Sequence, residues 1–298
     1  MTEGTVPFRT WETWYRISGE INERPPLVCV HGGPGSSHNY FGRLESIVST
    51  QRAVIVYDQV GCGRSSRPPV NELGLEVFVE ELINLRERLD LEQAHILGTS
   101  WGGMLAIEYA LLRPRGLMGL VLSSTLASIG TWADEARRLR DEMPEPYRSV
   151  LVAGHDLVDS GPSLDDAEAA FDARHVCRLP DAPEIRRMKE ERGKEVYRAL
   201  WGPNEWTPTG TLSGWDVRDR LIEIDVPTLI TAGRYDLCTP AVLRELEAGL
   251  PNSRTVLFDS SSHTPYLEQA TEYAAELNRF LDDADSGGAS RAGKYGAG

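Results

Sequence analysis

Short apolar runs bounded by turn residues recur along the chain. Six of them are LVCVHGG (27–33), AVIVYDQ (53–59), AHILGTS (94–100), GLVLSST (119–125), PTLITAG (227–233) and RTVLFDS (254–260). Their length and their content of β-branched residues predict strands that are buried on both faces of a sheet.

Amphipathic segments lie between these runs. One helical stripe is formed by apolar residues at positions i, i+4, i+7 and i+11, which are Phe78, Leu82, Leu85 and Leu89. Four charged residues lie off this stripe: Glu80, Glu81, Arg86 and Glu87. Strands that alternate with such helices predict an α/β fold, in which a mostly parallel sheet is covered by helices on both faces.

The alternation stops between residues 126 and 215, where the sequence becomes charged, loses the strand pattern and is interrupted by prolines. This segment follows the fourth apolar run, so it would lie over the carboxyl ends of the strands, where open α/β sheets bind ligands. We expect a core domain of residues 1–125 and 216–285 and an inserted helical cap domain of residues 126–215. Residues 286–298 are glycine-rich without a periodic apolar face, and we expect a disordered tail there.

The composition narrows the possible partners and location. The 298 residues carry a net charge of −14, which argues against nucleic acid and anionic membranes as partners and is also an ordinary route to solubility. The cysteines lack metal-site spacing, so we expect neither zinc nor a disulfide framework; they are Cys29, Cys62, Cys177 and Cys238. No apolar run approaches the ~18 residues of a membrane helix. A cytoplasmic location fits best.

The stretch GTSWGGM (98–104) contains the pattern Gly-x-Ser-x-Gly between an expected strand and an expected helix. In that context the pattern predicts a sharp turn that presents Ser100 as a nucleophile, with Gly98 and Gly102 removing Cβ atoms that would collide. A serine hydroxyl is a weak nucleophile by itself. A histidine base and an orienting carboxylate should therefore follow, in the chain order Ser, Asp, His.

Two residues fit this order. Asp236 follows the run 227–233, and His263 follows the run 254–260. By itself, an aspartate after a strand is usually a turn or cap residue, and a single histidine is usually structural. Together with Ser100 they predict a catalytic triad at the carboxyl ends of three strands. The other histidines precede the serine or lie in the cap, outside the expected order.

Two glycine-rich loops are candidate ligand sites. HGGPG (31–35) follows the first apolar run, and its backbone amides can face the serine, so we expect an oxyanion hole made by the N–H groups of Gly33 and Trp101. GCGRSS (61–66) lacks the third glycine of a dinucleotide-binding loop, because Ser66 stands in its place. The chemistry predicted here requires no metal and no organic cofactor.

Five motifs together resemble the proline iminopeptidases and related L-amino acid amidases, serine aminopeptidases of the α/β-hydrolase fold. They are HGGPG (31–35), DQVGCGRSS (58–66), GTSWGG (98–103), GPNEW (202–206) and GRYDLCTP (233–240). The resemblance implies an α/β-hydrolase fold and an exopeptidase that removes one N-terminal residue, often proline, from a peptide or small amide.

The resemblance also implies a substrate site. Glu205 matches the cap glutamate of the family, which would pair with the free amine of the substrate. Where a second glutamate is expected after the triad aspartate, this chain has Leu237, which offers apolar contact and places a strict proline preference in doubt. Cys238 would form part of the pocket wall. Another cap carboxylate, such as Glu142 or Glu145, could replace the second glutamate, and the spacing selects neither.

We therefore expect a serine hydrolase that removes an N-terminal residue, proline or another apolar one, through an acyl-enzyme. One alternative is an esterase or amidase acting on a specialised metabolite, including removal of an aminoacyl group. A second is a non-catalytic binding protein with the same fold. The expected partner is a small molecule or short peptide with a free amine, and the sequence leaves the oligomeric state open.

Overall fold

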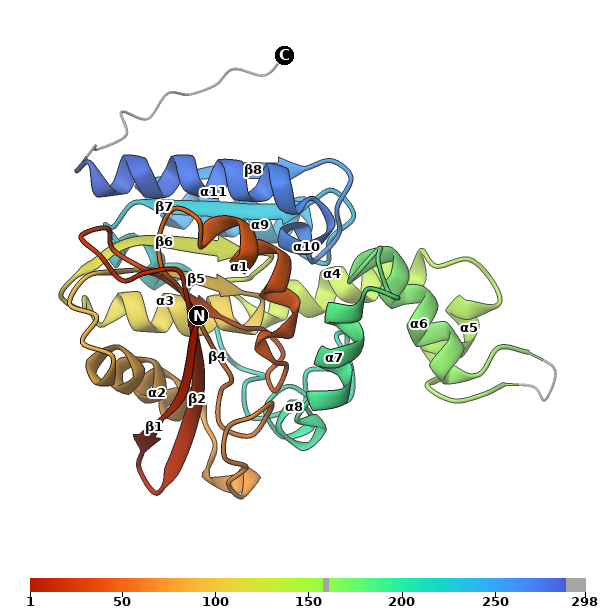
Figure 1. The fold of residues 1–298 in the computed structure, drawn as a ribbon. Coiled ribbons are helices and arrows are strands. Elements are labelled where there is room, and N and C mark those ends of the chain that lie inside the picture. Colours follow the sequence, from red (N-terminus) through yellow and green to blue (C-terminus); the bar gives the residue numbers. More distant parts are fainter. Residues whose placement is uncertain (158–160, 288–298) are drawn as a thin grey trace, which may run out of the picture.

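One mixed sheet organises the chain (Figure 1), which a computed structural model describes over residues 1–157 and 161–287. The expected tail lies outside the described residues from position 288 onward. The eight strands of the sheet occur in the order β1-β2-β4-β3-β5-β6-β7-β8. They are β1 (Thr2–Phe8), β2 (Trp11–Ser18), β3 (Leu27–Val30), β4 (Val54–Tyr57), β5 (Ala94–Thr99), β6 (Leu117–Ser123), β7 (Thr228–Gly233) and β8 (Ser253–Phe258).

The helices connect these strands. The α-helices are α1 (Gly42–Val48), α2 (Leu75–Arg88), α3 (Trp101–Leu111), α4 (Ile129–Asp141), α5 (Tyr147–Ala153), α6 (Leu164–His175), α7 (Pro183–Glu191), α8 (Lys194–Leu200), α9 (Pro240–Gly249), α10 (Pro265–Glu268) and α11 (Ala270–Asp285). Short 3-10 helices are η1 (His38–Phe41), η2 (Val70–Glu72) and η3 (Arg218–Glu223).

Pairing in the sheet is parallel from β4 across to β8, and β1 and β2 add an antiparallel hairpin at one edge. The predicted α/β class is therefore confirmed. The six apolar runs all become strands, but the strand at 254–260 is not buried on both faces. It is the edge strand β8, whose residues are mostly half-buried. The hairpin at the other edge was not predicted from the sequence.

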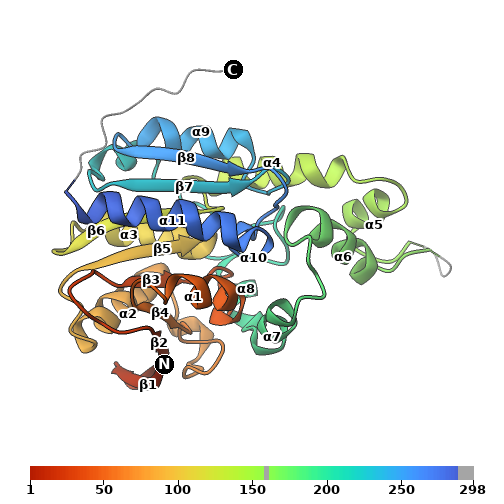
Figure 2. The ribbon, with the colours of Figure 1, turned by 45° about the horizontal axis from the view of Figure 1, so that its top comes forward.

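Alternate residues of the central strands face two separate apolar clusters. Val28 and Val30 of β3 pack with side chains of α2 and α3, whereas Leu27 and Cys29 pack with side chains of α1 and α11. Figure 2 shows these two helical layers on opposite sides of the sheet. The period of two along each strand explains why a continuous apolar run is needed, because both faces are covered.

Helices α4 to α8 all lie between β6 and β7 in the chain, and α5, α6 and α7 project past the end of the sheet (Figures 1 and 2). The chain leaves and returns at neighbouring points. An isolated antiparallel bridge joins Ser128 to Asp216, and the Val217 N–H donates to the Ala127 carbonyl at 2.9 Å. The helical segment 126–215 is therefore an insertion whose two ends lie next to each other.

The strand order reverses at β3, which lies between β4 and β5. Open α/β sheets bind ligands at such a reversal, outside the carboxyl ends of the strands. The loop HGGPG follows β3 and Ser100 follows β5, so both lie at this point. Within the described ranges, no helix combines the length and apolar character that crossing a bilayer needs.

Helix α2 departs from its predicted pattern at Glu81, which is fully buried although it lies off the apolar stripe. Its carboxyl accepts hydrogen bonds from the Thr13 hydroxyl and from the Val60 backbone N–H at 3.0 Å. Burial raises the pKa of Glu81 to about 8; these hydrogen bonds oppose the shift and the Asp58 charge adds to it. The group is therefore largely protonated at neutral pH.

This buried acid makes stability depend on pH. Unfolded, Glu81 returns to its ordinary pKa of 4.5, so between pH 4.5 and about 8 the folded chain holds a proton that the unfolded chain has lost. Its stabilisation is complete below that window and is lost as pH rises through it, by about 1.4 kcal/mol per pH unit. In denaturant titrations Glu81→Gln should lack this component, and the exposed Glu87→Gln should keep it. Equal pH slopes for wild type and Glu81→Gln would contradict the assignment.

Candidate active site

Ser100 occupies a sharp turn between β5 and α3, with φ 53° and ψ −122°. Side-chain-bearing residues rarely adopt this conformation, which costs about 1–3 kcal/mol. The close approach of helix and strand enforces it. A Cβ on Gly98 would lie 2.2 Å from the Gly102 carbonyl oxygen, and one on Gly102 would lie 2.1 Å from the Val30 oxygen. The Ser100 N–H donates to Ser123 at 3.0 Å, and Thr125 donates to the Ser100 carbonyl at 2.7 Å.

Asp236 and His263 come together at the carboxyl ends of β7 and β8. The His263 Nδ1 lies 2.7 Å from Asp236 Oδ1, and the same oxygen accepts the Cys238 N–H at 2.8 Å. Because the carboxylate accepts the Nδ1 proton, the neutral ring leaves Nε2 free to act as a base. Burial is the largest influence on the pKa of His263 and lowers it, but the charge and hydrogen bond of Asp236 outweigh it and leave that pKa raised.

Ser100 and His263 line one pocket, whose volume is about 220 Å³. In the described part of the chain, no hydrogen bond joins the Ser100 hydroxyl to His263. Catalytic hydrogen bonds are often long in unliganded sites and shorten when substrate binds. The three predicted residues thus share one site, with the aspartate–histidine contact already formed.

The remaining histidines are engaged elsewhere, and among the described residues none of them lines this pocket. His31 is fully buried, its Nε2 accepts the Gln59 N–H at 3.0 Å, and burial lowers its pKa to about 4. His95 contacts Asp285, and the Nδ1 of His175 contacts the Tyr235 carbonyl. His31 is therefore a neutral structural residue.

The two expected oxyanion donors lie on segments joined by one side chain, Gln59. Its Nε2 donates to the His31 carbonyl at 2.8 Å, and its Oε1 accepts the Trp101 indole N–H at 2.9 Å. Within residues 1–157 and 161–287, neither the Gly33 nor the Trp101 backbone N–H donates to another protein group. Sequence reasoning missed Gln59, although it lies in the DQVGCGRSS motif. The oxyanion role itself stays a prediction.

Glu205 lines the same pocket and is held by neutral donors. The Tyr197 hydroxyl donates to Oε1 at 2.7 Å, and the Trp132 indole N–H donates to Oε2 at 3.2 Å. The Trp132 ring also packs edge-on against the His263 ring, with centroids 5.6 Å apart. One tryptophan therefore positions the carboxylate relative to the histidine.

The structure gives other predicted pocket residues different surroundings. Leu237 and Cys238 are buried and are not among the residues that line the pocket; the Cys238 thiol donates to the Thr125 carbonyl at 3.0 Å. Their contact with substrate stays a prediction. Glu142 and Glu145 do not supply a second pocket carboxylate, because they pair on the surface with Arg138 and Arg148. The further carboxylates in the pocket are Glu168 and Asp172 of α6, which no sequence motif marked.

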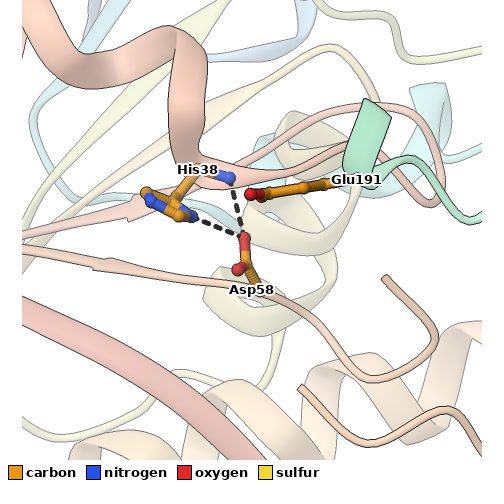
Figure 3. A group of neighbouring side chains, drawn as sticks. All are labelled: His38, Asp58 and Glu191. Atoms are coloured by element: carbon orange, nitrogen blue, oxygen red, sulfur yellow. Dashed lines mark hydrogen bonds and ion pairs between the residues drawn. The ribbon is translucent and has the colours of Figure 1, made fainter. Parts of the chain in front are cut away.

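A second group of titratable residues comprises His38, Asp58 and Glu191 (Figure 3). The ring Nδ1 and the backbone N–H of His38 each lie 2.8 Å from Asp58 Oδ1, and the Arg64 N–H donates to Asp58 Oδ2 at 2.9 Å. Asn39 donates to Glu191 at 2.6 Å. These three side chains are of types that bind metal ions, but each already has a hydrogen-bond partner in the protein. We therefore assign the group a structural role, in which it holds together the loop after β4, η1 and the end of α7.

Comparison with known proteins places the chain in a family. A family model described as the alpha/beta hydrolase fold matches residues 25–270. A proline iminopeptidase of Clostridium botulinum is 41% identical over 291 residues, covering 96% of this chain and 99% of that protein. The chain belongs to the proline iminopeptidase family of α/β hydrolases. The resemblance inferred from the five motifs is thereby confirmed.

Further comparisons give the same fold and show similar full-length coverage. A proline iminopeptidase of Lactobacillus helveticus is 43% identical over 289 residues, covering 95% of this chain and 98% of that protein. The crystal structure of proline iminopeptidase from Mycobacterium smegmatis has a TM-score of 0.86 at 35% identity, covering 96% of this chain and 99% of that one. The crystal structure of VinJ has a TM-score of 0.89 at 34% identity, covering 95% and 99%.

The strained turn at Ser100 has a measurable energetic signature. Glycine tolerates the observed φ of 53°, whereas alanine does not, so Ser100→Gly should be more stable than Ser100→Ala. After the extra flexibility of glycine in the unfolded chain is subtracted, the expected difference is about 1 kcal/mol. Thermal and denaturant unfolding of the two variants measures it. A less stable Ser100→Gly would show that the turn is not strained.

Proposed function

We propose that the protein is a serine aminopeptidase that removes one N-terminal residue from a peptide or small aminoacyl amide. The observation that carries the proposal is a single pocket that holds Ser100, the Asp236-oriented His263 and the carboxylate of Glu205. Family membership supports the same reaction, because the similar proteins are named proline iminopeptidases. Of the two alternatives from the sequence, the esterase or amidase of a specialised metabolite differs from this proposal in its substrate, whereas the binding protein differs in having no catalysis.

The proposed chemistry is acyl transfer. His263 Nε2 takes the proton of Ser100 as Oγ attacks the substrate carbonyl, and Asp236 holds the imidazolium that forms. The C–N bond then breaks, and the leaving amine receives that proton from His263. Water attacks the resulting ester with His263 again as the base, which releases the amino acid and restores the serine.

Charge that develops on the carbonyl oxygen requires fixed donors. The backbone N–H groups of Gly33 and Trp101 are proposed to supply them, supported by their freedom from protein acceptors within the described ranges. Gln59 holds their two segments at a constant separation through the contacts described above. Trp101 also begins helix α3, so its amide lies at the positive end of a helix dipole.

The proposed substrate site belongs to residues 126–215, which we propose as a cap domain. Glu205 would accept hydrogen bonds from the ammonium group of the N-terminal residue and fix the scissile bond over Ser100, because a charge-assisted hydrogen bond is strong and directional.

A cytoplasmic location is also proposed, supported by four buried cysteines that are free in the described structure.

An esterase or an amidase of a specialised metabolite would use the same triad, and dependence on a free amine separates it from the proposed function. A non-catalytic binding protein is disfavoured by the strained Ser100 and the formed Asp236–His263 contact, because neither is needed for binding alone.

The nucleophile is tested by Ser100→Ala. The variant should fold, lose turnover of alanyl p-nitroanilide by a factor of about 10⁴ or more, and fail to react with a fluorophosphonate probe. Replacement of His155, which is exposed on the cap, serves as the control and should leave both readouts near wild type. Retained turnover in Ser100→Ala would remove the serine mechanism.

The amine anchor is tested by Glu205→Gln. This change keeps the shape but removes the charge, so kcat/KM for alanyl p-nitroanilide should fall by about tenfold or more relative to that for p-nitrophenyl acetate, which has no amine. Glu195→Gln, on the exposed side of α8, is the matched control. Equal losses on both substrates would show that Glu205 does not recognise the amine. If the wild-type protein cleaves N-acetylalanyl p-nitroanilide as fast as alanyl p-nitroanilide, a free amine is not required and the alternative substrates are favoured.

A further inference from the structure

The cap side of the pocket contains more acidic than basic residues. Three carboxylates line it, from Glu168, Asp172 and Glu205, against the two cations of Lys189 and Arg192. The guanidinium of Arg192 lies 4.4 Å from the centre of the Tyr197 ring, a cation–π contact that leaves its positive charge in place. When all five side chains are ionised, the carboxylates outnumber the cations and this side of the pocket carries a net negative charge.

With Glu168, Asp172 is one of two pocket carboxylates whose side chains have no hydrogen-bond or ion-pair partner within the described ranges, and it is the more deeply placed of the two. It lies in the last turns of α6, directly after Phe171, whose buried ring packs against Trp206 with centroids 5.2 Å apart. The Asp172 backbone carbonyl accepts the Val176 and Cys177 N–H groups, each at 2.8 Å. In the described part of the chain, its side chain makes no hydrogen bond and no ion pair. Helix α6 thus places the Asp172 carboxylate in the pocket wall, where no described side chain donates a hydrogen bond to it or pairs with its charge.

Asp172 is half-buried and lies near other acids. Burial raises the pKa of Asp172 to about 6; the Lys189 and Arg192 charges oppose this rise, and the Glu205 and Glu168 charges add to it. An enclosed carboxylate without a partner costs free energy, which a cationic ligand offsets. Near neutral pH the carboxylate is largely ionised and available to such a ligand.

A second unpartnered atom lies beside Glu205. The Asn204 side-chain oxygen is buried, lacks a hydrogen-bond partner among the described residues, and belongs to a residue that lines the same pocket. Like the carboxylates, this oxygen is an acceptor. A ligand that satisfies both residues must therefore donate N–H groups and carry positive charge, which an ammonium group does and a carboxylate does not.

We propose that Asp172 is a second carboxylate that binds the α-ammonium group of the substrate together with Glu205. This inference rests on the proposed function, since it assigns a further residue to the same amine site. It also makes charge, and not side-chain shape alone, a determinant of specificity. Asp172 would touch the substrate, but not the reacting atoms.

Asp172→Asn tests the proposal, with Asp165→Asn as the matched control because Asp165 is exposed on the same helix and does not line the pocket. At pH 7.5 the ratio of kcat/KM for alanyl p-nitroanilide to that for p-nitrophenyl acetate should fall by about tenfold or more in Asp172→Asn, mainly through KM. The ratio should stay at its wild-type value in Asp165→Asn. Asp172→Glu, which keeps the charge, should retain most of the preference and remains informative if the asparagine variant folds poorly.

Three outcomes overturn the inference. If the ratio in Asp172→Asn is unchanged, the inference fails. The proposed function still stands in that case, provided that the wild-type protein cleaves the free-amine anilide. Loss of the preference in Asp172→Glu, with an unchanged melting temperature, would show that the charge is not what matters. A loss confined to lysyl p-nitroanilide would assign Asp172 to a substrate side chain instead of the α-amine. If wild type fails to cleave any free-amine anilide, the proposed function itself fails.

Discussion

The close contact between helix α3 and the sheet is the constraint on which the site depends. Glycines at positions 98 and 102 allow backbone to meet backbone there, and the chain must reverse from strand to helix within one residue. Ser100 is that residue, and its strained conformation follows from the packing rather than from any contact of its side chain. The same reversal begins helix α3 at Trp101, whose backbone N–H donates to no protein group within the described ranges. A packing requirement thereby places a hydroxyl and a donor group side by side.

Acids that are buried or half-buried in this protein fall into distinct classes. Asp58 and Asp236 have donors supplied by the fold, so their charge is compensated before any ligand arrives. Glu81 avoids charge because burial keeps it protonated. Glu205 has only neutral donors, and the Asp172 side chain has no partner among the described residues. The fold thus compensates its structural acids but not those of the pocket, which agrees with the proposal that the latter bind the substrate amine.

Much of the core and of the triad could be predicted from the sequence, because both depend on local patterns. Runs such as 94–100 encode a buried strand, and Ser100, Asp236 and His263 each follow a strand end. The N-terminal hairpin was missed because an edge pair needs no continuous apolar run. The burial of Glu81 could not be predicted, because helical periodicity identifies only the side of the helix that faces the core on average. Glu81 lies off that side but faces the loop after β4, where it accepts the Val60 N–H. Asp172 could not be found, since the packing of α6 over the pocket is a tertiary property.

The two ends of the helical insertion lie next to each other, joined by the Ser128–Asp216 bridge. Segments of different length or sequence can therefore be exchanged between these ends without altering the strand order, because the core meets the same pair of chain ends in every case. The proposed triad residues belong to the part that carries the sheet, and the carboxylates proposed to bind the amine belong to the segment between the two chain ends. Substrate range and bond-breaking chemistry are thus free to diverge separately in descendants of this chain.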